Sequence, residues 1–147
     1  MTPSALQAAT VQAKLRLMRE LLDDLSSIGD VTPEMLERER LVRRAVERVL
    51  TQLVNLAVSV NSHVVTASRG RAPANYRASF NDAAELGMLP RELAETLKPS
   101  VGMRNVLVHE YAAVDLARVA RAVPTALESY GAYVREVARW LADRTTG

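Results

Sequence analysis

Cysteine is absent from this chain of 147 residues, and tryptophan and phenylalanine each occur only once. Without cysteine there can be no disulfide bonds, no thiolate metal site and no cysteine nucleophile, which suits a reducing cytoplasm. Aromatic residues make up 4% of the sequence. A platform on which single-stranded bases stack is therefore not expected.

Long apolar runs and targeting segments are lacking as well. The longest apolar stretch, Leu53 to Val60, contains Asn55 and Ser59 and is too short to span a bilayer. The first four residues have no basic region ahead of an apolar stretch, so no signal peptide is indicated. With 48% hydrophobic residues, the sequence predicts a soluble cytoplasmic protein that forms one domain over residues 1–147.

Lysine is scarce, whereas arginine is abundant. Seventeen arginines accompany two lysines, although the net charge is only +2. The guanidinium fork matches the oxygens of a phosphate, so this bias fits phosphate recognition. A coding preference for arginine explains it equally well.

Helical periodicity dominates the chain, and strand patterns are nearly absent. Thr32-Pro33 resembles an N-cap followed by proline at the first helical position, Gly87 resembles a helix stop, and Asp115 is expected to cap the last helix. Pro124 should kink that helix. The expected helices cover Leu6 to Ile28, Glu34 to about Ser68, Asn75 to Leu86, Pro90 to Leu97, Ser100 to Glu110, and a final helix after Asp115.

The helix expected over Glu34 to about Ser68 is unusually long and apolar. At about 1.5 Å per residue it would reach roughly 50 Å. From Leu50 to Val65 it is apolar on nearly all sides, which predicts packing partners in more than one direction. A second copy of the chain would supply them. The predicted fold is an all-α, up-down bundle of long antiparallel helices with short helices inserted.

The segment from Arg104 to His109 carries the residues best suited to chemistry. Arginine holds phosphate, and histidine titrates near neutral pH. Asn105 and His109 are four residues apart on one helical face, so the amide is expected to orient the imidazole. Arg104 lies about 7.5 Å below His109 along the axis and can extend toward the same pocket. The plainer interpretation is a solvated arginine, and a histidine favoured by the helix dipole.

One copy of this segment provides a single base and a single cation. In a two-fold dimer, two such segments would share one cleft. One histidine could then deprotonate a ribose 2′-hydroxyl while the other protonates the leaving 5′-oxygen. The arginines would stabilise the charge that develops on the phosphate.

Arg104, Asn105, His109 and Tyr111 together resemble the R-N-x-x-x-H-x-Y signature of HEPN-domain proteins, specifically the HepT-like toxins paired with a minimal nucleotidyltransferase antitoxin. Further similarity lies in Arg43 to Gln52 with Asn61-Ser62-His63, in Ala72 to Tyr76 with Phe80, and in Leu86 to Leu89. The resemblance covers roughly residues 10 to 142.

This resemblance implies a homodimeric, HEPN-like endoribonuclease that needs neither metal nor cofactor. Arg104 and His109 match the catalytic pair of the family, and Asn105 matches the polar position beside the arginine. Tyr111 matches the tyrosine to which the antitoxin transfers AMP; a tyrosine that merely packs at a helix end is the alternative. The substrate would be an RNA such as tRNA or mRNA, and no membrane is involved.

Five further residues are candidates for the site or its surroundings. Asn55 stands where the family often carries an acidic residue, which leaves the role of that carboxylate in doubt. His63 is interpreted as a hydrogen-bonded, partly buried histidine rather than a catalytic one. Arg69, Arg71 and Arg77 cluster near a loop and could line the path of the RNA, or could form an ordinary solvated face.

A rival hypothesis is a non-catalytic HEPN module. Such a module would dimerise, dock a nucleotidyltransferase and bind a nucleotide or phosphate. The joint presence of Arg104, Asn105, His109 and Tyr111 favours the enzyme, because a scaffold needs none of these side chains.

Overall fold

The computed structural model describes residues 6–109 and 114–145. Helices are the only regular secondary structure among the described residues, as the sequence predicted. These helices are α1 (Ala8–Ser27), α2 (Pro33–Arg38), α3 (Arg40–Arg69), α4 (Tyr76–Glu85), α5 (Arg91–Leu97), α6 (Pro99–His109) and α7 (Leu116–Thr145).

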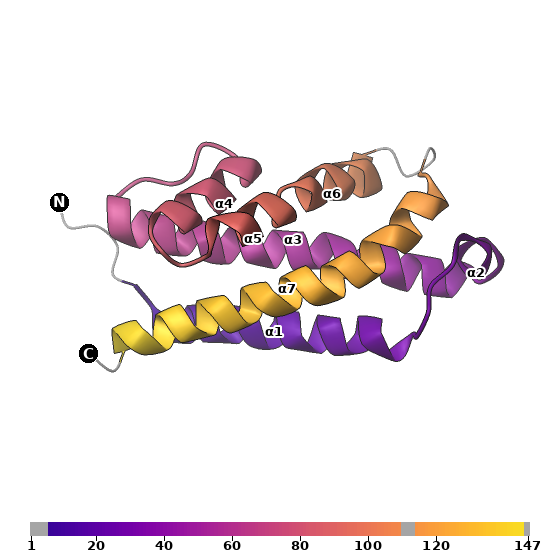
Figure 1. The fold of residues 1–147 in the computed structure, drawn as a ribbon, viewed down its shortest axis with the longest axis horizontal. Coiled ribbons are helices and arrows are strands. Elements are labelled where there is room, and N and C mark those ends of the chain that lie inside the picture. The colour runs from indigo at the N-terminus through magenta and orange to yellow at the C-terminus, as the bar shows by residue number, and fades with distance from the viewer. Residues whose placement is uncertain (1–5, 110–113, 146–147) are drawn as a thin grey trace.

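The three long helices form the body of the molecule, and the short ones complete it (Figure 1). Helix α3 runs opposite to α1, the short helices α4, α5 and α6 return the chain along α3, and α7 runs back beside α1. Helix α3 contacts α1 and α7 as well as α4 and α6, so it is the central element. The predicted up-down bundle with inserted short helices is therefore confirmed.

Side-chain caps begin three of the helices, and two of these caps, Thr32 and Asp115, were predicted from the sequence. The Thr32 hydroxyl accepts a hydrogen bond from the Met35 amide at 3.1 Å, and the Asp115 carboxylate accepts one from the Ala117 amide at 3.0 Å. Asn75 caps α4 in the same way. Each cap satisfies an amide that has no partner within the first turn of its helix. Gly87 follows α4 with a φ of 82°, a left-handed conformation that favours glycine.

The long helix expected from Glu34 to about Ser68 is divided in two, and that prediction was wrong. Glu39 leaves the helical region with φ −109° and ψ 87°, so the short helix α2 ends before α3 begins. Leu36 of α2 is fully buried, and α2 packs against both α3 and α7. A straight helix would carry Leu36 past the end of the bundle, so burying this side chain favours the break.

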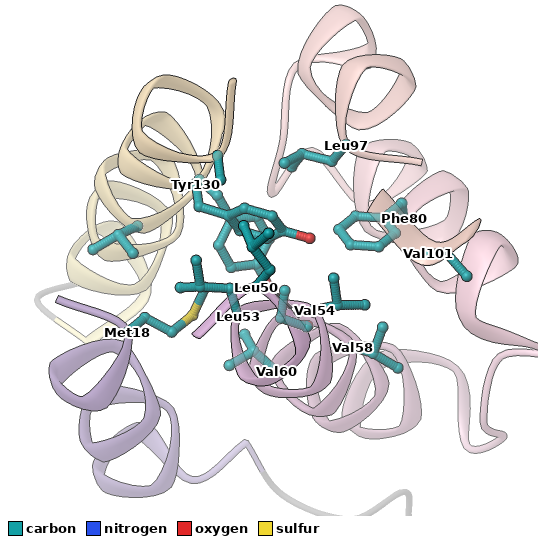
Figure 2. Packing of buried hydrophobic residues seen from close by; sticks show 14 of the residues in the cluster. Met18, Leu50, Leu53, Val54, Val58, Val60, Phe80, Leu97, Val101 and Tyr130 are labelled. Carbon is teal, nitrogen blue, oxygen red and sulfur yellow. Dashed lines mark hydrogen bonds between the residues drawn. The ribbon is translucent and has the colours of Figure 1, made fainter. Parts of the chain in front are cut away.

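Helix α3 finds its packing partners within its own chain. Its buried residues between Leu50 and Val65 face α1 and α7 on one side and α4 and α6 on the other. Figure 2 shows Met18, Leu53, Phe80 and Tyr130 from four helices meeting in one core. The apolar perimeter of α3 thus requires no second copy, contrary to the expectation from sequence.

Among the described residues, α3 is the one helix whose length and composition would allow it to cross a membrane, and most of its apolar window is buried inside the bundle. Helix α7 contains Pro124 and changes direction in its first part (Figure 1), in line with the expected kink.

Candidate active site

Helix α6 presents the Arg104 to His109 segment on the outside of the bundle. Val101, Met103 and Leu107 are buried and fix one face of α6 against the core. The hydroxyls of Ser100 and Tyr130 lie 2.6 Å apart, which ties the start of α6 to α7. The opposite face of α6, with the predicted site residues, is left accessible to a ligand.

Arg104 is held by three neighbours from three helices. Its Nε donates a hydrogen bond to the Asn55 amide oxygen of α3 at 3.1 Å. One of its terminal nitrogens donates to the Asn105 amide oxygen at 3.3 Å, and its guanidinium lies 5.2 Å from the centre of the Tyr76 ring. The guanidinium is therefore oriented before any ligand arrives.

All three neighbours of Arg104 are uncharged. Within the part of the chain that the structure describes, Arg104 forms no ion pair. The two amide oxygens each accept one hydrogen bond from the guanidinium, and the ring contributes a cation–π contact, yet none of the three cancels the positive charge. The charge therefore remains available for an anionic ligand.

Asn105 does not hydrogen-bond His109 in this structure. Its amide oxygen accepts from Arg104 instead, so the expectation that it orients the imidazole is not supported. His109 is the exposed last residue of α6. Tyr111 lies outside the described residues, so the structure gives no position for it.

A buried chain of hydrogen bonds fixes Tyr76. The Tyr133 hydroxyl of α7 donates to the Asn61 amide oxygen of α3 at 2.6 Å. The Asn61 amide nitrogen donates to the Ser79 hydroxyl at 3.2 Å, and Ser79 donates to the Tyr76 carbonyl at 2.7 Å. Burial raises the pKa of Tyr133, which keeps this phenol a hydrogen-bond donor. The network therefore links the core to the backbone of Tyr76, the residue whose ring contacts Arg104.

A hollow opens beside Arg104, between the start of α4 and the outer face of α6. Its volume is about 470 Å³. We call it the α4–α6 hollow; its lining residues are Asn75, Tyr76, Arg77, Val101, Arg104 and Asn105. It contains two arginines and no carboxylate, so its lining is positively charged.

The three arginines predicted to line the RNA path have different surroundings. Arg69 pairs with Asp82 at 3.2 Å and with Glu85 at 2.7 Å, which joins the end of α3 to α4. Its charge is compensated, so a role in RNA binding is not supported. Arg71 and Arg77 are exposed, and neither forms an ion pair with any described residue. Of the three, Arg77 alone lines the α4–α6 hollow.

His63 lies away from Arg104 and has a structural contact. Its Nε2 accepts a hydrogen bond from the backbone amide of Gln7, the residue that precedes α1, at 3.0 Å. The side chain is partly buried. The interpretation of His63 as a hydrogen-bonded, partly buried histidine is confirmed.

Two residues gain a place in the site that the sequence did not give them. Asn55 was distinguished only as a departure from an acidic position, and Tyr76 only as part of a loop motif. A polar residue inside the apolar run of α3 was a usable signal for Asn55. Nothing local marked Tyr76, because its contact with Arg104 joins residues far apart in the chain.

Comparisons with known proteins agree with this fold. The family model described as Ribonuclease HepT-like matches residues 18–137. The chain is 28% identical over 137 residues to a tRNA nuclease HepT of Aphanizomenon flos-aquae, covering 92% of each protein. It is 26% identical over 85 residues to an mRNA nuclease HepT of Shewanella oneidensis, covering 58% of this chain and 64% of the relative.

A solved structure described as a tri-AMPylated Shewanella oneidensis HEPN toxin in complex with an MNT antitoxin has the same fold. It superposes with a TM-score of 0.78 at 19% identity, over 88% of this chain and 96% of the other.

Proposed function

The chain belongs to the Ribonuclease HepT-like family, and from this premise we propose that it is a metal-independent endoribonuclease, the toxin of a toxin–antitoxin pair. The observation that carries the proposal is Arg104, oriented by Asn55, Asn105 and Tyr76 without a carboxylate partner among the described residues. His109 follows on the same helix, about 7.5 Å further along the axis.

The chemistry proceeds by proton transfer at a single phosphodiester. The ribose 2′-oxygen attacks phosphorus while its proton passes to one His109 imidazole. The bond from phosphorus to the 5′-oxygen breaks, and a second imidazole protonates that oxygen. The products are a 2′,3′-cyclic phosphate and a 5′-hydroxyl. Arg104 stabilises the charge on the non-bridging oxygens during the attack.

The second imidazole must come from a second copy of the chain. His63, the other histidine, is bound to the Gln7 amide and is engaged far from Arg104 in the sequence and in the fold. A two-fold dimer that apposes the outer faces of α6 would place two His109 side chains in one cleft. We therefore propose dimerisation because catalysis needs a second His109, and not because α3 needs another packing partner.

The proposed partners follow from the relatives. The curated relatives are named as nucleases of tRNA and of mRNA, so the substrate is proposed to be one of these RNAs. The structural neighbour is an AMPylated toxin bound to an MNT antitoxin. We infer that a nucleotidyltransferase antitoxin neutralises this chain in the cytoplasm by adding AMP to Tyr111. AMP two residues from His109 would add a bulky anion that repels RNA phosphate.

The test uses the purified chain with total tRNA and mRNA in the presence of a metal chelator. Cleavage that leaves 2′,3′-cyclic phosphate ends, and that is lost in His109→Ala, supports the proposal. A second arm mixes wild-type with His109→Ala subunits: because both imidazoles of a shared cleft are needed, the mixed dimers should be inactive, and activity should fall more steeply than the fraction of wild-type subunits. A wild-type chain that binds RNA but cuts none in chelator is instead the non-catalytic module.

After co-expression with a neighbouring nucleotidyltransferase gene, the mass of the intact chain tests the antitoxin. A gain of AMP that disappears in Tyr111→Phe supports modification at that residue. An unchanged mass, or a gain that persists in Tyr111→Phe, contradicts it.

A further inference from the structure

We propose that the α4–α6 hollow is a subsite for the nucleotide next to the cleaved phosphodiester, with Arg77 binding the phosphate of that nucleotide. This inference rests on the proposed ribonuclease function, which needs only Arg104 and His109. The subsite adds a second point of contact for the RNA.

The charge of the hollow suits a phosphate. Arg77 and Arg104 both line it, and neither is paired with a carboxylate among the residues that the structure describes. The remaining polar lining consists of the amides of Asn75 and Asn105 and the phenol of Tyr76. Neutral hydrogen-bonding groups around two guanidinium groups favour an anion that also carries hydroxyls and ring nitrogens.

Gly102 explains how Arg77 reaches α6. A glycine inside a helix costs about 1 kcal/mol relative to alanine, so its presence needs a reason. A Cβ built on Gly102 would lie 3.4 Å from a terminal nitrogen of Arg77. The guanidinium of Arg77 therefore lies in contact distance of α6 at Gly102, and a side chain much longer than that of alanine would compete for the same space.

The order of residues along α6 places the hollow on the side of Arg104 that is further from His109. The hollow contacts Val101, Arg104 and Asn105, while His109 lies about one and a half turns beyond Arg104. Arg104 is thus placed between the hollow and His109. A phosphodiester held between Arg104 and His109 leaves its neighbouring nucleotide at the hollow. A volume of about 470 Å³ is within the usual range for sites that hold one small ligand.

The test measures binding without cleavage. In a His109→Ala background, a fluorescent single-stranded RNA is titrated with protein at several salt concentrations. Arg77→Gln should weaken binding about fivefold to tenfold and reduce the salt slope by about 0.7, the loss of one phosphate contact on a single strand. Arg71→Gln is the matched control, because Arg71 is equally exposed and unpaired but lies outside the hollow.

Gly102→Leu provides a second variant that leaves every charge in place. Leucine is a better helix former than glycine, so α6 should remain stable while Arg77 is displaced. Its binding defect should match that of Arg77→Gln, and the double variant should be no weaker than either single one. Equal binding by Arg77→Gln and Arg71→Gln, or wild-type affinity in Gly102→Leu, would overturn the subsite.

Cleavage assays supply a separate arm. Arg77→Gln should raise KM with little change in kcat on a long RNA, and should have no effect on a dinucleotide, whose only phosphate is the one that is cleaved. If the wild type cuts no RNA, the proposed function fails while the binding comparison still decides the subsite. An equal loss on the dinucleotide contradicts the subsite while leaving the ribonuclease proposal intact.

Discussion

Two arginines that join neighbouring helices illustrate opposite uses of the same side chain. Arg69, at the end of α3, is met by the carboxylates of Asp82 and Glu85 on α4. Arg104, on α6, is met by the amides of Asn55 and Asn105 and by the ring of Tyr76. Both are anchored, but only Arg104 keeps a positive charge that its described neighbours do not compensate.

The charge of its partners distinguishes a structural arginine from a functional one more clearly than its exposure to solvent does. The hydrogen bond from Arg69 lowers the pKa of Glu85, while the same bond raises the pKa of Arg69. Each charge therefore stabilises the other and attracts an external ion less strongly. Hydrogen bonds that Arg104 donates to neutral amide oxygens orient it equally well without this cancellation. The immediate partners of an arginine thus indicate its role better than its position near a loop.

Single replacements of Arg104 and of Arg69 by alanine should show the largest difference in ribonuclease activity. Arg104→Ala is expected to reduce ribonuclease kcat/KM about 10³-fold, because a preorganised donor to the transition state is lost. Arg69→Ala should leave kcat/KM within about twofold, since its partners lie on the scaffold. Initial rates on the same RNA measure both. A comparable loss of activity in the two variants would remove the distinction between them.

A carboxylate partner would compensate the charge of Arg104, as Asp82 and Glu85 compensate the charge of Arg69. Asn55→Asp places an acidic group where the amide oxygen now lies 3.1 Å from Nε. The adjacent guanidinium lowers the pKa of that new carboxyl, so it is ionised at neutral pH and compensates the charge of Arg104. We expect kcat/KM to fall several-fold at pH 7, and the ratio of Asn55→Asp to wild-type kcat/KM to rise toward acidic pH as the carboxyl becomes protonated.

The pH profile of cleavage distinguishes this effect from damage to the fold. Asn55→Leu, which cannot ionise, should lose activity by the same factor at every pH where the wild type is active. A flat ratio of Asn55→Asp to wild type across the acid range would show that neutrality of this partner is unimportant.

The hydrogen-bond network of Tyr133, Asn61 and Ser79 should affect the stability of the protein more than its affinity for RNA. Tyr133→Phe leaves the buried Asn61 amide oxygen without its donor at 2.6 Å. The expected loss is about 1 to 3 kcal/mol in the free energy of unfolding, measured by urea denaturation. The affinity of correctly folded protein for RNA should fall only slightly, because Tyr76 retains its packing. An unchanged urea midpoint would contradict a structural role for the network.

Loss of the ion pairs of Arg69 should have the smallest effect, which is a change in how the melting temperature depends on pH. Glu85 has a pKa below its ordinary value near 4.5. Its stabilising contribution is therefore complete above that ordinary value and is lost as pH falls through the lower, folded-state pKa. In Arg69→Gln this part of the acid-induced destabilisation should disappear. Melting temperatures of both proteins between pH 3 and about pH 6 provide the measurement.

Much of the fold was predictable because it depends on local signals. Thr32, Asn75 and Asp115 cap helices through amides two or three residues away, and Gly87 stops α4 through its own backbone. The break at Glu39 was not predictable, since it depends on where Leu36 can be buried between distant helices. The proposed roles of His109 and Tyr111 remain predictions.

The sequence by itself determined the helices, the absence of thiol chemistry and the placement of Arg104 and His109 on one helix, because each follows from residue type and spacing. Tertiary structure decided that α3 is covered by its own chain and that Arg69 is paired while Arg104 meets only neutral groups among the described residues. These outcomes depend on contacts such as that between Asn55 and Arg104, which join residues far apart in the chain and have no local signature.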